Sequence, residues 1–545
     1  MRSINTLMSR KILGFIFVFI IILVSYQCAQ RGNPTGGPKD ITAPELTRAE
    51  PPNMTTNFKG QKIRLYFNEL VKLKDIQKQL IISPPLKNSP VLSPIGNANK
   101  YVEITIKDTL APNTTYTLNF GQGIVDNNEE NPKSFFTYVF STGDYIDSLE
   151  LKGVVKDAFN KKPDDFISVM LYKIDTSYTD STIYKRPPNY ITNTLDSAII
   201  FKLNNLKEGK YALFGVKDAA NNNLFDQKTD KIAFVKDTIN LPTDSIYLLT
   251  LFKEIPDYSV AVPTMEASNK ISFGYYGEGS DISINTLTEI PDTVKTIITK
   301  ERDKDTLNFW FTPYEMDSLI FTLTNEKLKV RDTFKVKSRK VAFDSLKISM
   351  SQNGTIEFDK PINLLSNTPL IRFDSTKIKL MDKDSIEIAV NVKLDSLRNL
   401  LNFDFKIDPD QNYRMELIPG AVTDFFETTN DSVAFSFKTK SLADYGNLTL
   451  NLNGNSIVYP IIVQLTNEKG ELQREIYATE PQVYTFDNLN PGKYQARVIF
   501  DLNGNGKWDT GNLLKKIQPE KISYYPALIE LRANWEKIET FNLID

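Results

Sequence analysis

From about residue 54 onward, apolar and polar residues alternate in short runs along the chain. Examples are KIRLYFNELV (62–71), KYVEITI (100–106), TYTLNF (115–120) and FFTYVFST (135–142), each bounded by Asn, Asp, Gly or Pro. A period of two places the apolar side chains of a strand on one face. Strands that recur at intervals of about 8–12 residues are typical of sandwiches and barrels. The pattern predicts an all-β chain, in which ELVKLKDIQKQL (69–80) is the clearest helical candidate.

A first segment of the chain occurs twice. NTTYTLNFGQGIVDNNEENPKSFFTYVFSTG (113–143) aligns without gaps with DQNYRMELIPGAVTDFFETTNDSVAFSFKTK (410–440). The alignment pairs Tyr116 with Tyr413, Gly123 with Gly420, Phe140 with Phe437 and Thr142 with Thr439. Upstream of it, IRLYFNELV (63–71) corresponds to GTIEFDKPI (354–362).

A second repeated segment follows each copy of the first. FKLNNLKEGKYALFGVKDAANNNLFD (201–226) aligns with YTFDNLNPGKYQARVIFDLNGNGKWD (484–509). Repetition of two distinct units is typical of modular exported proteins and unlike a single catalytic scaffold. The predicted modules are A (42–143), B (148–254), X (257–338), A′ (339–441) and B′ (443–545).

The first 27 residues have the features of an export signal. Arg2, Arg10 and Lys11 precede the continuous apolar run ILGFIFVFIIILV (12–24). This run is shorter than the roughly 20 residues that a membrane-spanning helix needs, and its length fits the apolar region of a signal peptide. The sequence therefore predicts a signal peptide over residues 1–27 and an exported protein.

Cys28, the only cysteine, directly follows this predicted signal peptide. A single cysteine excludes internal disulfides. Its position is the one at which bacterial lipoproteins are acylated and cleaved, although SYQ (25–27) departs from the usual Leu, Ala or Ser, Gly or Ala before that site. The alternative is a signal peptide cut elsewhere and an incidental cysteine. Residues 28–53, rich in Gly and Pro, predict an irregular tether between a lipid anchor in the membrane and module A.

The composition excludes several classes of function. The chain has no histidine, which rules out Ser-His-Asp triads, Cys-His pairs and histidine zinc sites. Its 65 Lys plus Arg nearly balance its 67 Asp plus Glu, so nucleic acid is not an expected partner. Glycan hydrolysis by two carboxylates needs no histidine. A carboxylate-dependent glycan hydrolase, or another envelope enzyme, is therefore the alternative to a non-enzymatic protein.

Module A contains five short segments that together suggest a family. These are PP (51–52), LYFNELV (65–71), IISPP (81–85), APNTTYTLNF (111–120) and FST (140–142). Module A, and more weakly A′, resembles the bacterial Ig-like domain of surface-layer and other envelope proteins. The start of the tether, CAQRGNPTGGPKD (28–40), is similar to that of exported Ig-like lipoproteins of Gram-negative gliding-type bacteria.

Modules B and B′ share a Leu-x-x-Gly-x-Tyr stretch that leads into a loop rich in Asp and Asn. This pattern resembles the carboxypeptidase-regulatory or transthyretin-like β-sandwich. The resemblances imply tandem sandwiches with adhesive or spacer roles and no catalytic residues. We expect an outer-membrane lipoprotein, facing the periplasm or the cell surface, that binds an envelope protein or a glycan. Its exposed sheet edges or loop tips are the expected contact sites.

The loop DLNGNGKWDTGN (501–512) in B′ has the spacing of a calcium loop. Gly506 stands at position 6, where a sharp turn is needed, but position 12 is Asn512 in place of a bidentate Glu. The related loop DAANNNLFD (218–226) in B has Ala220 at position 3. The alternative is an Asx-turn loop that needs no ion, so no cofactor is required and Ca²⁺ is the candidate. The candidate metal-binding residues, at positions 1, 3, 5, 7 and 9, are Asp501, Asn503, Asn505, Lys507 and Asp509.

Two further patterns have a functional and a structural interpretation. Asp followed by Ser or Thr and an aliphatic residue recurs, and this resembles an O-glycosylation sequon of the same bacteria; the alternative is a turn that begins a strand. Its occurrences include residues 108–110, 147–149, 237–239, 305–307, 344–346 and 384–386. Trp310 and Trp508 are candidates for a carbohydrate-binding surface; we favour a place in the sandwich core for Trp310 and a loop-closing role for Trp508.

Overall fold

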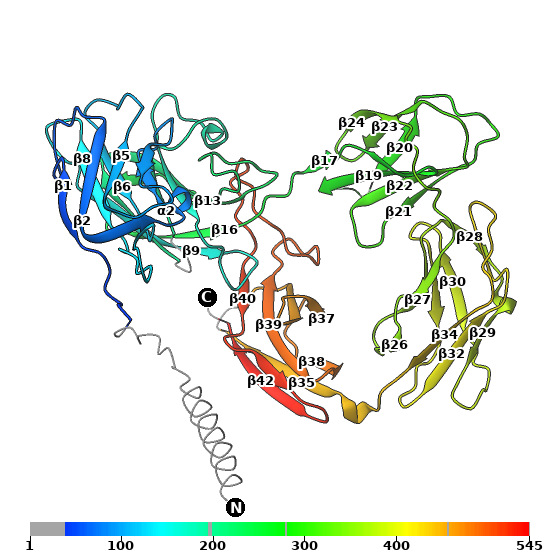
Figure 1. Ribbon diagram of the computed structural model, residues 1–545. Coiled ribbons are helices and arrows are strands. Elements are labelled where there is room, and N and C mark those ends of the chain that lie inside the picture. The colour runs from blue at the N-terminus through cyan, green and yellow to red at the C-terminus, as the bar shows by residue number, and fades with distance from the viewer. Residues whose placement is uncertain (1–38, 195–198, 278, 280, 455–456, 544–545) are drawn as a thin grey trace, which may run out of the picture. The chain divides into compact units, whose positions relative to one another are not determined.

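The computed structural model describes residues 39–194, 199–277, 279, 281–454 and 457–543 (Figure 1). The described residues separate into two compact units, one of residues 39–82 and 86–146 and one of residues 83–85 and 147–543. The predicted signal peptide, Cys28 and the tether up to residue 38 lie outside the described residues. No helix within the described ranges has the length and apolar character needed to cross a membrane.

Module A consists of two sheets (Figure 1), and its buried apolar residues form one core. One sheet has the order β1 (Leu46–Glu50), β2 (Lys62–Leu73), β5 (Asn99–Thr105) and β4 (Val91–Ser93), and β7 (Ile124–Asp126) also pairs with β2. The other has the order β3 (Ile81–Ser83), β6 (Thr115–Asn119) and β8 (Thr137–Ser141). Alternate residues of β2, such as Ile63, Leu65 and Phe67, are buried in this core, as the period of two predicts.

Two local predictions for module A are wrong. The helix expected over 69–80 is limited to α2 (Ile76–Gln79), because β2 continues to Leu73 and pairs with β7. The irregular tether expected over 28–53 ends before Leu46, because β1 pairs with β2 from Leu46 to Glu50. Leu46 and Ala49 pack against the core, which stabilises a strand in a segment where the prolines lie outside the strand.

Modules B and B′ have the same strand order, so the second repeat is confirmed in structure. In B, β9 (Leu149–Asp157) pairs antiparallel with β12 (Ile200–Leu206) and parallel with β16 (Ile246–Leu251). In B′, β35 (Gly446–Asn453) pairs in the same way with β38 (Tyr484–Leu489) and β42 (Glu536–Asn542). The Tyr211 hydroxyl donates to Lys207 O at 3.0 Å and the Tyr494 hydroxyl to Asn490 O at 2.6 Å, so both copies close the turn before the central strand alike.

The second sheet of each of these modules contains that central strand. In B the order is β11 (Tyr190–Asn193), β10 (Ser168–Lys173), β13 (Gly209–Lys217) and β14 (Lys231–Phe234), with β15 (Ile239–Leu241) also on β13. In B′ the order is β37 (Leu472–Ala478), β36 (Ile461–Asn467), β39 (Gly492–Phe500) and β40 (Ile522–Tyr524), with β41 (Ile529–Leu531) also on β39. Tyr494, Ala496 and Val498 of β39 face the core together, as predicted.

Module X pairs all of its strands antiparallel. Its first sheet has the order β17 (Tyr258–Val260), β19 (Lys270–Gly277), β22 (Thr306–Phe311) and β21 (Thr296–Lys300), and β18 (Thr264–Ala267) also pairs with β19. Its second sheet has the order β20 (Ile282–Thr286), β23 (Ser318–Asn325) and β24 (Val330–Lys337). Leu307, Phe309 and Phe311 of β22 face the core between the two sheets.

Modules A and A′ share a tyrosine whose hydroxyl binds a backbone N–H five residues earlier. The Tyr116 hydroxyl accepts from Ala111 N at 2.9 Å, and the Tyr413 hydroxyl accepts from Asp408 N at 2.8 Å. The strands of A′ are β25 (Ile348–Met350), β26 (Gly354–Thr355), β27 (Ile362–Ser366), β28 (Leu370–Phe373), β29 (Ile378–Met381), β30 (Asn391–Asp395), β31 (Leu400–Asp404), β32 (Asn412–Leu417), β33 (Val422–Asp424) and β34 (Val433–Lys438). They form the orders β25-β27-β31-β30, β26-β34-β32-β29 and β28-β33.

Short 3₁₀ turns occur at Thr182–Tyr184, Ser375–Lys377 and Leu442–Asp444.

The strand pairing shows that the alignment of residues 63–71 with residues 354–362 is wrong. Gly354 pairs with Phe437 as Thr55 pairs with Phe140, and both pairings are parallel. The segment GTIEF therefore corresponds to residues before β2, and the counterpart of β2 is β27, which begins at Ile362. The alignment was wrong here because apolar residues alternate in GTIEF with the same period of two as in the following strand, β27.

Candidate functional site

The loop 501–512 begins the connection from β39 to β40 in module B′, and Asp501 is its anchor. Asp501 is fully buried, and its Oδ1 accepts from Gly504 N at 2.8 Å and Asn505 N at 3.1 Å. Its Oδ2 accepts from Gly506 N at 2.7 Å. The carboxylate thereby satisfies three backbone N–H groups of a tight loop in which Gly504 and Gly506 have φ of 72° and 74°.

The other predicted metal-binding side chains converge on Asp509. Its Oδ2 accepts from Asn503 Nδ2 at 2.5 Å and from Asn505 Nδ2 at 2.7 Å. The Oδ1 atoms of the two asparagines accept from backbone N–H groups of the loop. Lys507 is exposed and contributes its backbone N–H to Asn505 Oδ1 at 2.8 Å. The loop thus brings the side chains of Asn503, Asn505 and Asp509 together. The polar atoms that a metal ion would need already form hydrogen bonds within the loop.

A residue that the sequence did not single out, Glu520, holds the loop from outside. Its Oε1 accepts from Leu502 N at 2.8 Å and its Oε2 from Asp509 N at 2.9 Å. Burial raises the pKa of the Glu520 carboxyl, hydrogen bonds from the backbone oppose this shift, and the nearby Asp509 and Asp501 carboxylates add to it. Both oxygens already have backbone donors, so Glu520 serves to brace the loop.

The related loop of module B has the same brace at a different spacing. Asp218 Oδ2 accepts from Asn223 N at 2.7 Å, five residues on, as Asp501 accepts from Gly506. Asp230 accepts from Ala219 N at 3.0 Å and Asp226 N at 2.8 Å, which is the part that Glu520 plays in B′. The brace lies 12 residues after Asp218 but 19 after Asp501, and both residues lie beyond the aligned segments, which end at Asp226 and Asp509.

The residues present fit a calcium site only in part. Position 12 does not complete the ligand set, because Asn512 Oδ1 accepts from Lys515 N within its own turn. Within the ranges that the structure describes, no group of three or more His, Cys, Asp or Glu is placed to hold a metal ion. A cation at Asp509 would need the Asn503 and Asn505 amides to present oxygen in place of nitrogen.

Trp508, within the same loop, joins module B′ to module B. Its ring packs on Phe159 with centroids 4.8 Å apart, and its Nε1 donates to Glu520 O at 3.0 Å. The guanidinium of Arg497, in B′, lies over the Phe159 ring, 4.4 Å from its centroid. Thr510 Oγ1 donates to Lys253 O at 2.6 Å, and Leu513 N donates to the buried Glu254. The loop predicted as a metal site is thus a contact between the two related modules.

Trp310 is buried, but the expected place in the sandwich core is wrong. It leaves the core face of β22 to Leu307, Phe309 and Phe311 and lies on the opposite face. There its ring meets Phe426 of module A′ with centroids 6.3 Å apart, and its Nε1 donates to Thr299 Oγ1 at 2.9 Å. With 1% of its surface exposed, Trp310 is not available to a carbohydrate.

Backbone groups strengthen this joint between X and A′. Lys300 N donates to Leu397 O at 2.7 Å, and Arg302 Nη1 donates to Ser366 O at 3.1 Å. Asn269 bonds to both backbone groups of Asp344, each at 3.2 Å. These side-chain and main-chain contacts of module X add to the one that Trp310 makes with A′.

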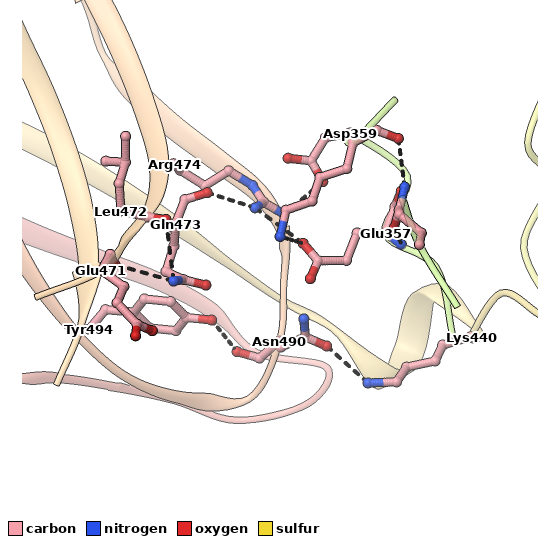
Figure 2. A network of polar contacts seen from close by, with 11 residues as sticks. Glu357, Asp359, Lys440, Glu471, Leu472, Gln473, Arg474, Asn490 and Tyr494 are labelled. Carbon is pink, nitrogen blue, oxygen red and sulfur yellow. Dashed lines mark hydrogen bonds and ion pairs between the residues drawn. The ribbon is translucent and has the colours of Figure 1, made fainter. Parts of the chain in front are cut away.

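A network of polar contacts joins A′ to B′ (Figure 2). Arg474 points from β37 toward Glu357 and Asp359, with nitrogen–oxygen distances of 3.6 Å and 2.9 Å. Lys440 Nζ donates to Asn490 Oδ1 at 2.9 Å, and Asn490 O accepts from the Tyr494 hydroxyl. Only 13% of the Arg474 side chain is exposed, so this cation is held between the two modules.

Arg474→Ala should weaken the A′–B′ joint. In a double-mutant cycle with Asp359→Ala, we expect a coupling of about 1 kcal/mol in calorimetric unfolding, since the arginine is largely shielded from water. The matched control is Arg414 with Glu416, a pair 2.7 Å apart on one strand whose side chains are 57% and 35% exposed. Its coupling should be about 0.3 kcal/mol. Equal couplings in the two cycles would contradict the assignment of Arg474 to the joint.

The predicted glycosylation sequons lie at accessible places. Thr109, Ser148, Thr238, Ser345 and Ser385 are exposed, and Thr306 is half-buried. Exposure agrees with both the modification and the turn interpretation, so the glycosylation stays a prediction. The intact mass of the protein from its native source distinguishes the two, because each attached glycan adds its full mass.

Comparison with known families decides the identity of module A. Residues 40–142 match the family model of the bacterial Ig-like domain. The chain carries a bacterial Ig-like domain. This Ig-like domain spans the two sheets of module A, so the fold predicted there is confirmed, and the all-β, multi-domain architecture around it is the one that the sequence predicts. A search of curated proteins returns no match to the chain.

The solved structures to which the chain is similar include a surface-layer protein and titin. Surface layer protein SbsC, domains 1–6, is 11% identical over 90% of this chain and 67% of its own, with a TM-score of 0.16. Titin domains A168–A170 are 12% identical over 52% of this chain and 99% of theirs, with a TM-score of 0.13. The BSP domain of a biofilm associated protein is 7% identical over 93% and 99%, with a TM-score of 0.14. At such TM-scores these likenesses support no statement about function.

Proposed function

We propose that this protein is a non-enzymatic lipoprotein of the cell envelope, anchored in the outer membrane through Cys28, that binds or scaffolds envelope components. The observation that carries the proposal is that buried or largely buried aromatic and charged side chains form contacts between modules. Trp310 joins X to A′, Arg474 joins A′ to B′ and Trp508 joins B′ to B. Such joints favour a protein that presents surfaces at fixed positions.

The carboxylates of the repeated loops support a structural role over catalysis. A glycoside hydrolase needs one free carboxylic acid and one free carboxylate on either side of a substrate. Asp501 and Glu520 instead direct both of their oxygens to backbone N–H groups. The bacterial Ig-like domain of residues 40–142 fits this non-catalytic role.

The membrane anchor can be tested separately from the scaffold. We expect the wild-type chain in the outer-membrane fraction and Cys28→Ser in the soluble exported fraction, because the thiol is the acylation point. Affinity purification of the anchored protein from detergent-solubilised envelopes should recover a protein or glycan partner. Retention of Cys28→Ser in the membrane would overturn the anchor, and hydrolysis of envelope glycans by the purified chain would overturn the non-enzymatic assignment.

We further propose that the loop 501–509 is a weak calcium site that the fold does not require. Asp501 already satisfies the loop's N–H groups without an ion, while Asn503, Asn505 and Asp509 converge on one point. Extracellular calcium modules bind with dissociation constants of about 10⁻⁴–10⁻³ M.

Calcium at about 5 mM should therefore raise the free energy of unfolding by about 1–2 kcal/mol. The measurement is calorimetric unfolding with excess EDTA and with CaCl₂. EDTA should leave the protein folded. In Asp509→Asn, which keeps an acceptor but loses the charge, the calcium effect should disappear. No stabilisation of the wild type, or equal stabilisation of the variant, would exclude the site.

A further inference from the structure

A cavity of about 530 Å³ lies between modules B and B′, within the second compact unit. Module B contributes residues of β9 and β16, the end of β14 and the segment after it, and B′ contributes β40 and the residues that precede it. This volume is in the range of sites for small organic molecules.

Four lysines from the two modules line this cavity. Lys156, Lys161 and Lys236 come from B, and Lys521 comes from B′. The acidic side chains in the lining are Asp157 and Glu520. The cavity therefore has an excess of positive formal charge, in a chain whose net charge is −2.

The two acids are already engaged elsewhere. Asp157 Oδ2 is 2.7 Å from Lys231 Nζ, and its Oδ1 accepts from Phe159 N and Asn160 N. Glu520 accepts from the two backbone N–H groups of the loop that it braces. Among the described residues, Lys156, Lys236 and Lys521 form no ion pair.

Two of the lining lysines, Lys156 and Lys521, come from different modules. Surrounding protein lowers the pKa of Lys156, and the positive charge of Lys521 lowers it further. Both lysines are exposed, and two cations from different modules repel each other. The modules nevertheless stay in contact here, because Lys161 Nζ donates to Pro526 O at 2.7 Å and to Gln495 Oε1 at 3.0 Å.

The rest of the lining suits the body of a small organic molecule. Thr250, opposite Lys156 in the β16–β9 register, and Asn160 offer polar groups. Leu248, Ile522 and Tyr524 offer apolar and aromatic surface. A ligand with a charged oxyanion at one end and a compact polar body would contact both kinds of surface.

We propose that this cavity binds a small organic anion, whose phosphate or carboxylate group lies between Lys156 and Lys521. Lysine is a common point-charge partner of such groups, and the anion would relieve the repulsion between the two ammonium groups. The cavity shares Glu520 with the calcium loop, but the anion would contact Lys156 and Lys521. Its binding can therefore be tested apart from calcium and from the lipid anchor.

The test is titration calorimetry of the purified full-length chain in detergent at low ionic strength. The probes are inorganic phosphate, glucose 6-phosphate and glucuronate, each up to about 10 mM, which covers dissociation constants in the millimolar range. We expect at least one organic anion to bind more tightly than inorganic phosphate. A preference for glucose 6-phosphate assigns a phosphate ligand, and a preference for glucuronate assigns a carboxylate ligand.

Two double variants with equal loss of charge decide the location. Lys156→Met with Lys521→Met should weaken binding by at least about tenfold, as expected for lost charge-assisted hydrogen bonds. Lys152→Met with Lys469→Met removes one exposed lysine from each module outside the cavity and should leave binding unchanged. Thermal unfolding of both variants checks that they fold. No binding of any probe, phosphate binding as tight as that of the organic anions, or equal binding by the two double variants would overturn the proposal.

Discussion

Trp310→Ala is expected to reduce the free energy of unfolding by about 3–5 kcal/mol, the range for deletion of a buried aromatic side chain. The residue is 1% exposed and fills the space between β22 and Phe426. Its loss would leave a cavity between modules X and A′ and a Thr299 hydroxyl without its indole partner. Because both modules border this cavity, the variant should also show faster proteolytic cleavage in the connection between them, residues 338–347.

Two matched variants separate packing from hydrogen bonding at Trp310. Trp310→Phe keeps most of the ring and should cost about 1 kcal/mol, mainly for the lost Nε1 donor. Trp535→Ala removes a tryptophan that is 42% exposed and should cost less than about 1 kcal/mol. The measurements are calorimetric unfolding and timed limited proteolysis. If Trp310→Ala behaved like Trp535→Ala in both, Trp310 would not hold the joint.

The strands and the repeats could be predicted because their signals are local. Ile63, Leu65 and Phe67 alternate with polar residues and need no distant partner to identify their face. Tyr211 and Tyr494 stand at equal distances from the turns that they close, so a gap-free alignment pairs them correctly.

The errors in module A come from pairing between distant segments. The end of β2 has charged residues at helical spacing, but Leu73 pairs with Ile124 of β7, and nothing near residue 73 reveals that partner. The strand β1 lies between prolines, and it forms because its neighbour β2 offers an open edge.

The joints between modules could not be predicted because a single strand shows which face is apolar but not what covers its other face. Trp310 lies among polar residues of the outer face of β22, and its partner Phe426 belongs to another module. Glu520 was missed for a related reason, since its distance from the loop that it braces differs from that of Asp230. Both contacts depend on the folded arrangement rather than on spacing in the sequence.

Asp501→Ala should cost about 3 kcal/mol, because hydrogen bonds to charged groups contribute more than neutral ones and three N–H groups lose a buried acceptor together. The loop also carries Trp508, so its disorder would loosen the contact with Phe159 of module B. We expect the amides of Gly504, Asn505 and Gly506 to lose their protection from hydrogen exchange, and calorimetry should show the loss with EDTA and with calcium alike.

Two controls test whether the carboxylate itself is responsible for that loss. Asn503→Ala changes an exposed residue of the same loop and should cost less than about 1 kcal/mol. Asp218→Ala removes the related anchor of module B, whose Oδ2 accepts one backbone N–H, and should cost about 1 kcal/mol. An Asp501→Ala variant no less stable than Asn503→Ala would mean that Asp501 is not the anchor of the loop. A loss seen only with calcium present would instead mean that the ion, and not the buried hydrogen bonds, determines the loop's stability.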